Sequence, residues 1–219
     1  MKFPLVVGDF LDRAEHVYPN RVAVVDEPDQ PAPSLGSLTY REVARNARAQ
    51  AARLDALGVP VGGRVAFVSQ NSARLYTSFF GVSAFGRVLV PINFRLSRAE
   101  IAYIVEHSGS DVVYVDPEQK AIFDSLDVKH KFLLGEDDDL YLHEVEPQPW
   151  ADPDEGATAT INYTRRGPAG GPRRWSARPR RAVRRGWICP PVLADDRDEP
   201  PGSTVSSTSD GASGRGPGR

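Results

Sequence analysis

Two unlike parts make up this chain of 219 residues, and its near-neutral formal net charge of −2 conceals the difference between them. Residues 1–164 contain 15 Lys and Arg against 24 Asp and Glu, whereas residues 165–219 contain 12 Arg, no Lys and 5 acidic residues. No apolar run approaches the roughly 18–20 residues of a membrane span, and no signal peptide is visible. The one cysteine, Cys189, excludes an internal disulfide, so we expect a cytoplasmic protein.

Helix and strand patterns alternate along residues 8–164. Apolar residues spaced three or four apart predict helices at 10–18, 40–57, 73–85, 98–108 and 121–126. Short runs that are apolar without alternation predict strands at 22–25, 64–68, 87–90, 112–115, 132–134 and 159–164. Strands of this kind, separated by helices, indicate an α/β fold with a mainly parallel sheet flanked by helices on both faces.

Two helix starts carry a specific signature. Thr39 with Glu42, and Ser97 with Glu100, have the spacing of a capping box, in which each side chain satisfies a free backbone N–H at the start of the helix. Gly109 follows the second helix, where glycine commonly ends one.

Residues 135–155 form an acidic stretch with several prolines. We favour a solvated connecting loop over a metal site, because adjacent carboxylates splay apart and lack the spacing of a calcium loop.

The four histidines, His16, His107, His130 and His143, show no metal-binding spacing and are interpreted as structural or surface residues. Of these, His107 stands at the end of a predicted helix, where histidine commonly caps it.

Three segments resemble the acyl-CoA synthetases (fatty-acid–CoA ligases), which belong to the adenylate-forming, AMP-binding enzymes. They are Leu38-Thr39-Tyr40-Arg41-Glu42-Val43, the block from Val88-Leu89-Val90-Pro91-Ile92-Asn93 through Ser108-Gly109, and Ala159-Thr160-Ile161-Asn162-Tyr163-Thr164. The second is the most specific, and order and spacing also agree, so the resemblance covers nearly all of residues 8–164. No dinucleotide-binding glycine motif lies between a strand and a helix, which disfavours a Rossmann dehydrogenase.

The resemblance implies an N-terminal part of the adenylate-forming fold and a reaction in two steps. A carboxylate attacks the α-phosphate of Mg·ATP to give acyl-AMP, and the thiol of CoA then displaces AMP. The implied partners are therefore a carboxylic (fatty) acid, ATP, Mg and CoA. In the family, a phosphate loop of the form Y-T-S-G-T-T-G-x-P-K-G binds the polyphosphate, with glycines that let the backbone approach it.

The chain departs from this phosphate loop after Thr164. Tyr163 and Thr164 match it, but Arg165-Arg166 replace the expected Ser-Gly, and the hydroxyl pair and the Lys are missing. We expect a partial AMP-binding domain at 1–164, with Thr164 as the one cofactor-binding residue carried over and no catalytic or metal residue. The sequence predicts a truncated chain that is inactive alone, and a shifted reading frame after Thr164 is our hypothesis for the departure.

Residues 165–219 are rich in Arg, Gly and Pro and show no periodicity. They contain 9 Gly and 8 Pro with few large apolar residues, so we expect a disordered tail in which Cys189 has no nucleophilic role. The alternative is a non-catalytic protein whose tail binds nucleic acid, since residues 165–185 carry 9 Arg and no acid. We favour an unselected tail that binds polyanions weakly and without specificity.

Overall fold

The structure is a computed structural model that describes residues 4–136, 140–164 and 176–179. Its helices are α1 (Val7–Val17), α2 (Tyr40–Ala56), α3 (Ala73–Ser83), α4 (Arg98–Ser108) and α5 (Lys120–Phe123), with a 3-10 turn η1 (Pro117–Gln119). Its strands are β1 (Val22–Val25), β2 (Ser37–Thr39), β3 (Arg64–Ser69), β4 (Val88–Asn93), β5 (Val112–Val115), β6 (His130–Leu133), β7 (Ile161–Thr164) and β8 (Ser176–Pro179).

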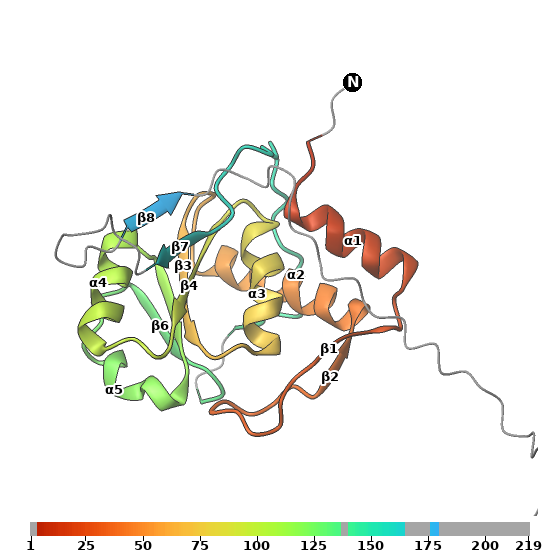
Figure 1. Ribbon diagram of the computed structural model, residues 1–219. Coiled ribbons are helices and arrows are strands. Elements are labelled where there is room, and N and C mark those ends of the chain that lie inside the picture. Colours follow the sequence, from red (N-terminus) through yellow and green to blue (C-terminus); the bar gives the residue numbers. More distant parts are fainter. Residues whose placement is uncertain (1–3, 137–139, 165–175, 180–219) are drawn as a thin grey trace, which may run out of the picture. The chain divides into compact units, whose positions relative to one another are not determined.

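The central element is a parallel sheet of four strands in the order β4-β3-β5-β6. Helices α2 and α3 lie on one face of this sheet, and α4 and α5 lie on the other (Figure 1). Parallel neighbours need a connection that returns across a face of the sheet, and a helix provides it. The predicted α/β fold with a mainly parallel sheet flanked by helices is confirmed.

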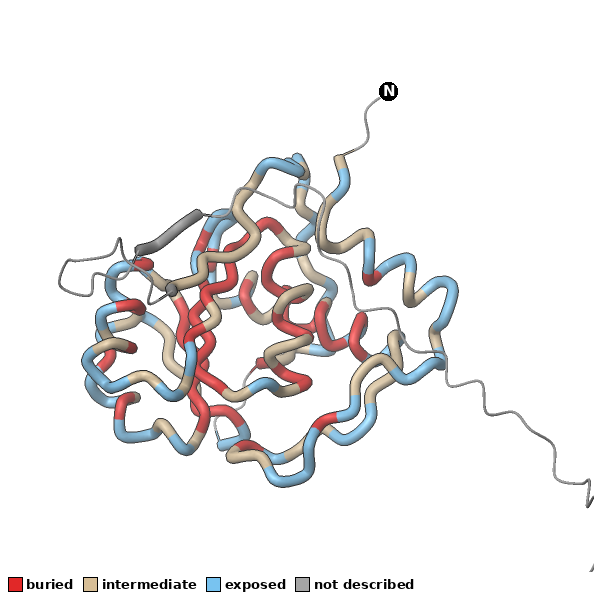
Figure 2. Tube along the Cα trace, in the orientation of Figure 1, coloured by how far each residue is buried: buried red, intermediate tan, exposed pale blue. Residues whose placement is uncertain are grey.

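The core is divided between the two faces of the sheet. Val65 and Phe67 of β3 belong to the apolar cluster that includes Leu54 of α2, whereas Ala66 and Val68 belong to the cluster that includes Ile101 of α4. Successive side chains of a strand point to opposite faces, so a strand covered on both sides must be apolar throughout. Figure 2 shows the burial concentrated in the strands and in the facing sides of the helices.

The two predicted capping boxes are present at the starts of α2 and α4. The Thr39 N–H donates to Glu42 Oε2 at 2.8 Å, and the Ser97 N–H donates to Glu100 Oε2 at 2.9 Å. In return, each hydroxyl oxygen accepts a hydrogen bond from the backbone N–H of the glutamate. Gly109 ends α4 in the left-handed conformation with φ +61°, as the sequence indicates.

Three features differ from the expectations. Residues 37–39 form a short strand, β2, antiparallel to β1; the resemblance implies an entry from a strand into a helix here, but three residues carry too little apolar pattern to predict the strand by themselves. Part of the connection after β6 is packed rather than solvated: Leu140 is fully buried, and the Leu142 N–H donates to Ala49 O at 2.9 Å. In the tail, β8 pairs antiparallel with β7.

The pairing of β8 satisfies backbone groups along one edge of β7, which is why regular structure occurs in a segment expected to lack it. The rest of the predicted disordered tail, Cys189 included, lies outside the described residues. Within the described ranges, no helix is long and apolar enough to cross a bilayer. The cytoplasmic location stays a prediction.

Candidate phosphate-loop site

Thr164, the one site residue predicted from the sequence, is the last residue of β7. Ala159 O, next to the start of this strand, accepts hydrogen bonds from the Leu89 N–H at 3.0 Å and from Ser83 Oγ at 2.8 Å. Thr160 forms an isolated parallel bridge with Leu89 of β4. The residues that would continue the phosphate loop, from Arg165 onward, lie outside the described residues.

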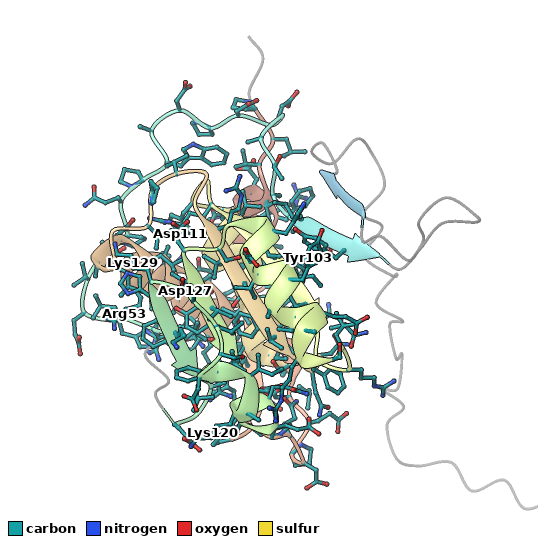
Figure 3. The ribbon with its side chains drawn as sticks, turned by 90° about the vertical axis from the view of Figure 1, so that its left-hand side faces the viewer. Arg53, Tyr103, Asp111, Lys120, Asp127 and Lys129 are labelled. Atoms are coloured by element: carbon teal, nitrogen blue, oxygen red, sulfur yellow. The ribbon has the colours of Figure 1, made fainter. Side chains whose placement is uncertain are left out.

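Tyr163, one residue before Thr164, is held by the end of α4. Its hydroxyl lies 2.8 Å from Nδ1 of His107, and the two rings meet edge to face with centroids 5.8 Å apart. Tyr103, one helical turn earlier on α4, stacks on His107 with centroids 5.4 Å apart. Figure 3 labels Tyr103 on α4, on the side of the molecule where β7 lies. Instead of capping α4 as expected, the side chain of His107 contacts β7.

The hydroxyl of Tyr163 stays protonated at neutral pH. Partial burial raises the pKa of Tyr163, and the neighbouring Tyr103 raises it further, while Arg64 acts in the opposite direction. A protonated hydroxyl both donates and accepts, so Tyr163 can pair with either tautomer of His107.

A cavity of about 330 Å³ opens between β4, α4 and β7. Its wall is apolar at Ile92, Leu96 and Ile104, and it carries polar atoms from Asn93, Arg95 and Tyr163. Pro91 lies in the same wall. The cavity is therefore beside the strand that leads to Thr164, on the side of the helix α4.

Asp116 is a buried carboxylate that sequence reasoning missed. It directly follows β5, is 4% exposed, and accepts a hydrogen bond from the Gln70 N–H at 2.8 Å. Burial raises its pKa, and the hydrogen bond from Gln70 opposes this shift. An Asp directly after a fully apolar strand was the available signal, because carboxyl ends of parallel strands meet at one edge of the sheet. The contact joins the residues that follow the carboxyl ends of the paired strands β3 and β5.

The described residues do not fit ATP and Mg by themselves. A polyphosphate needs a loop of converging backbone N–H groups, and in this chain such a loop would have to follow Thr164. Across the described ranges, no three His, Cys, Asp or Glu side chains gather in a way that could hold a metal ion. The structure therefore places the strand that leads to the predicted phosphate loop but no complete nucleotide site.

Comparisons with known proteins show the family of the chain. The family of AMP-binding enzymes matches residues 11–164, so the match ends at Thr164. The chain is 38% identical over 132 residues to a 4-hydroxybutyrate–CoA ligase of Metallosphaera sedula, covering 59% of this chain and 23% of that protein. It is 40% identical over 113 residues to a long-chain-fatty-acid–CoA ligase of Thermus thermophilus, covering 52% of this chain and 20% of that protein.

The fold agrees with solved structures of the same kind. The anthranilate–CoA ligase AuaEII, solved in complex with anthranoyl-AMP, superimposes with a TM-score of 0.65 at 26% identity. The superposition covers 78% of this chain and 33% of the AuaEII chain. The chain thus spans about a quarter or less of the curated relatives it matches. It belongs to the AMP-binding, adenylate-forming enzymes, and residues 11–164 correspond to the N-terminal part of an acyl-CoA synthetase.

Proposed function

We propose that residues 1–164 are the N-terminal part of an acid–CoA ligase, an enzyme that activates a carboxylic acid with ATP to acyl-AMP and then forms acyl-CoA. The relatives named above carry acid–CoA ligase activities in their names, and the family match covers the whole sheet. ATP, Mg and CoA are the cofactors of the proposed reaction. The domain limits are 1–164 for the partial AMP-binding domain and 165–219 for the tail.

We also propose that the polypeptide with this tail does not form acyl-AMP. The single observation that carries this is the coincidence at Thr164: the family match and the phosphate-loop motif both stop there. The following Arg165 and Arg166 attract phosphates, but they cannot adopt the tight glycine turn that brings backbone N–H groups to the polyphosphate. The Lys of the motif is missing as well.

The test is carboxylate-dependent exchange of pyrophosphate into ATP by the purified full chain. Short-chain, long-chain and aromatic carboxylates would be supplied with Mg, and an active acid–CoA ligase would serve as positive control. We expect exchange at the level of the buffer blank. Exchange that requires both carboxylate and Mg and disappears in Thr164→Ala would contradict the proposal and locate the activity in this chain rather than in a contaminant.

The reading-frame hypothesis has a test of its own. Translation of the other two frames of the gene after the Thr164 codon is expected to give a Ser-, Thr- and Gly-rich loop that ends in Lys-Gly. The protein made from that frame is then expected to exchange pyrophosphate. If neither frame contains such a loop, the arginine-rich tail is a genuine segment and the hypothesis is wrong.

For the tail we propose weak, non-specific binding to polyanions. The 9 Arg of residues 165–185 support it, because such contacts release counterions and weaken steeply with salt. Sequence-selective binding of DNA or RNA that survives moderate salt would instead favour the nucleic-acid-binding alternative.

A further inference from the structure

Strand β7 is joined to the sheet by its main chain near its start. The Leu89 N–H donates to Ala159 O, and the bridge between Leu89 and Thr160 is isolated. By comparison, β3 and β4 pair over six residues, from Arg64 with Val88 to Ser69 with Asn93. Beyond Thr160, β7 therefore runs near β4 without a continuous ladder of paired residues.

Pro91 explains where this ladder stops. In a parallel pair, the N–H groups that face one neighbour come from every second residue of a strand. Because the Leu89 N–H faces β7, the next donor toward β7 has to come from residue 91. Proline has no N–H, so this hydrogen bond cannot form. Proline is tolerated in β4 because its nitrogen faces away from β3, with which β4 remains fully paired.

The side chain of Tyr163 attaches β7 to α4 in a region where the main chain of β7 pairs with β8 rather than with β4. Its hydroxyl pairs with Nδ1 of His107 at 2.8 Å, and its ring meets the imidazole edge to face. The ring of Tyr103 stacks on the same imidazole, with ring centroids 5.4 Å apart. The cavity between β4, α4 and β7 is lined by both Pro91 and Tyr163, so it lies where the strands separate.

We propose that Pro91 and His107 together set the direction of β7: Pro91 releases the strand from β4, and His107 binds it to α4 through Tyr163. His107 is thus a positioning residue for Thr164, the last residue of β7. The inference rests on the proposed function in one respect, which is that Tyr163 and Thr164 are the last residues to match the family's phosphate-loop motif. The attachment itself is a property of the fold and is measurable without ATP.

The test compares amide hydrogen exchange of Ile161–Thr164 in variants of the full chain, with β3 as internal reference. His107→Ala and Tyr163→Phe are each expected to speed exchange in β7 about fivefold, the effect of losing one neutral hydrogen bond. The double variant is expected to be no faster than either single variant. Glu106→Ala, an exposed change one residue away on α4, is the matched control and is expected to leave the rates unchanged.

Two further variants separate positioning from general stability. His107→Asn keeps an amide group near the position of Nδ1, so it is expected to restore slow exchange and an unfolding midpoint close to that of the unsubstituted chain. Pro91→Ala returns the missing N–H and is expected to slow exchange in β7 and to reduce the effect of His107→Ala. The ¹⁵N signal of His107 Nδ1 is expected to shift in Tyr163→Phe.

Additive rates in the double variant, or no rescue by Asn, would overturn the role of His107. An unchanged effect of His107→Ala in the Pro91→Ala background would overturn the role of Pro91. Neither result changes the expected outcome of the pyrophosphate-exchange assay. Carboxylate-dependent exchange by this chain would contradict the proposed function, but it would not affect the attachment of β7.

Discussion

Gly81 shows how one residue sets the distance between two helices. A Cβ at this position of α3 would lie 3.0 Å from Ala47 O of α2 and closer still to the side chain of Gln50. Gln50 is fully buried and donates to Ser78 Oγ at 2.8 Å, so it has no free space into which to move. The absence of a side chain at Gly81 therefore lets α2 and α3 pack in direct contact.

Gly81→Ala is expected to destabilise the protein by about 1–3 kcal/mol, since overpacking forces backbone shifts. Urea unfolding followed by circular dichroism measures the change. Gly156→Ala is the control, because its added methyl meets the flexible side chain of Asp154. Equal stability of the two variants would show that α2 and α3 separate without cost.

The ion pair between Glu15 of α1 and Arg48 of α2 gives a pH-dependent prediction. Nη1 and Nη2 of Arg48 each donate to the Glu15 carboxylate at 2.9 Å, and this hydrogen bonding lowers the pKa of Glu15 below its ordinary 4.5. A lowered folded-state pKa means that the stabilisation is present above the unfolded-state pKa. It is lost as pH falls through the lowered value.

Glu15→Gln is therefore expected to reduce the free energy of unfolding at pH 7 by at most about 1 kcal/mol, because the pair is partly exposed. The difference from the unsubstituted protein is expected to shrink below pH 4. Unfolding curves collected between pH 3 and pH 7 measure it, and a difference that grows toward acid would have the wrong sign for this pair.

At the scale of elements, the capping boxes offer the sharpest test of sequence reasoning. Thr39→Ala removes the hydroxyl that accepts from the Glu42 N–H and is expected to cost about 1 kcal/mol. Thr39→Ser keeps the hydroxyl and is the matched control. Thermal unfolding measures both, and an equal loss in the two variants would show that the β-branched methyl rather than the cap matters.

Most helices and strands were predictable because each depends on local pattern. The run Val112–Val115 is apolar at every position because both faces of β5 are buried, and the sequence shows this directly. The order β4-β3-β5-β6 was not predictable, since it depends on which face each connecting helix crosses. Apolar periodicity could not predict the short β2 or the turn η1, because three residues are too few for a period.

At the scale of the whole molecule, the sequence identified the family and the residue at which the match to its phosphate-loop motif ends. Thr164 was identified from adjacent residues, and the family match ends at the same residue. The contact between His107 and Tyr163 joins residues 56 positions apart and has no local signature. Asp116 has a local signal, since it directly follows a fully apolar strand, but its partner Gln70 follows a different strand and could not be predicted from it.

The connection between β6 and β7 packs against the end of α2 and the turn that follows α3. Trp150 packs against Gly86, at φ +78°, so closely that a Cβ there would lie 2.9 Å from the indole. Nearby, the Gln148 N–H donates to Asp55 Oδ2 at 2.7 Å. Trp150→Ala is expected to cost about 1–3 kcal/mol and to expose residues 140–158 to proteases. Cleavage sites mapped by mass spectrometry check this, and unchanged cleavage would contradict it.

The place of Trp150 has a practical consequence for spectroscopy. The chain has three tryptophans, and Trp150 is the one within the described part, since Trp175 and Trp187 belong to the tail. A difference emission spectrum between the unsubstituted chain and Trp150→Phe therefore isolates the fluorescence of one indole resting on a backbone turn. Its red shift in denaturant would report unfolding of the sheet region alone, whatever the tail is doing.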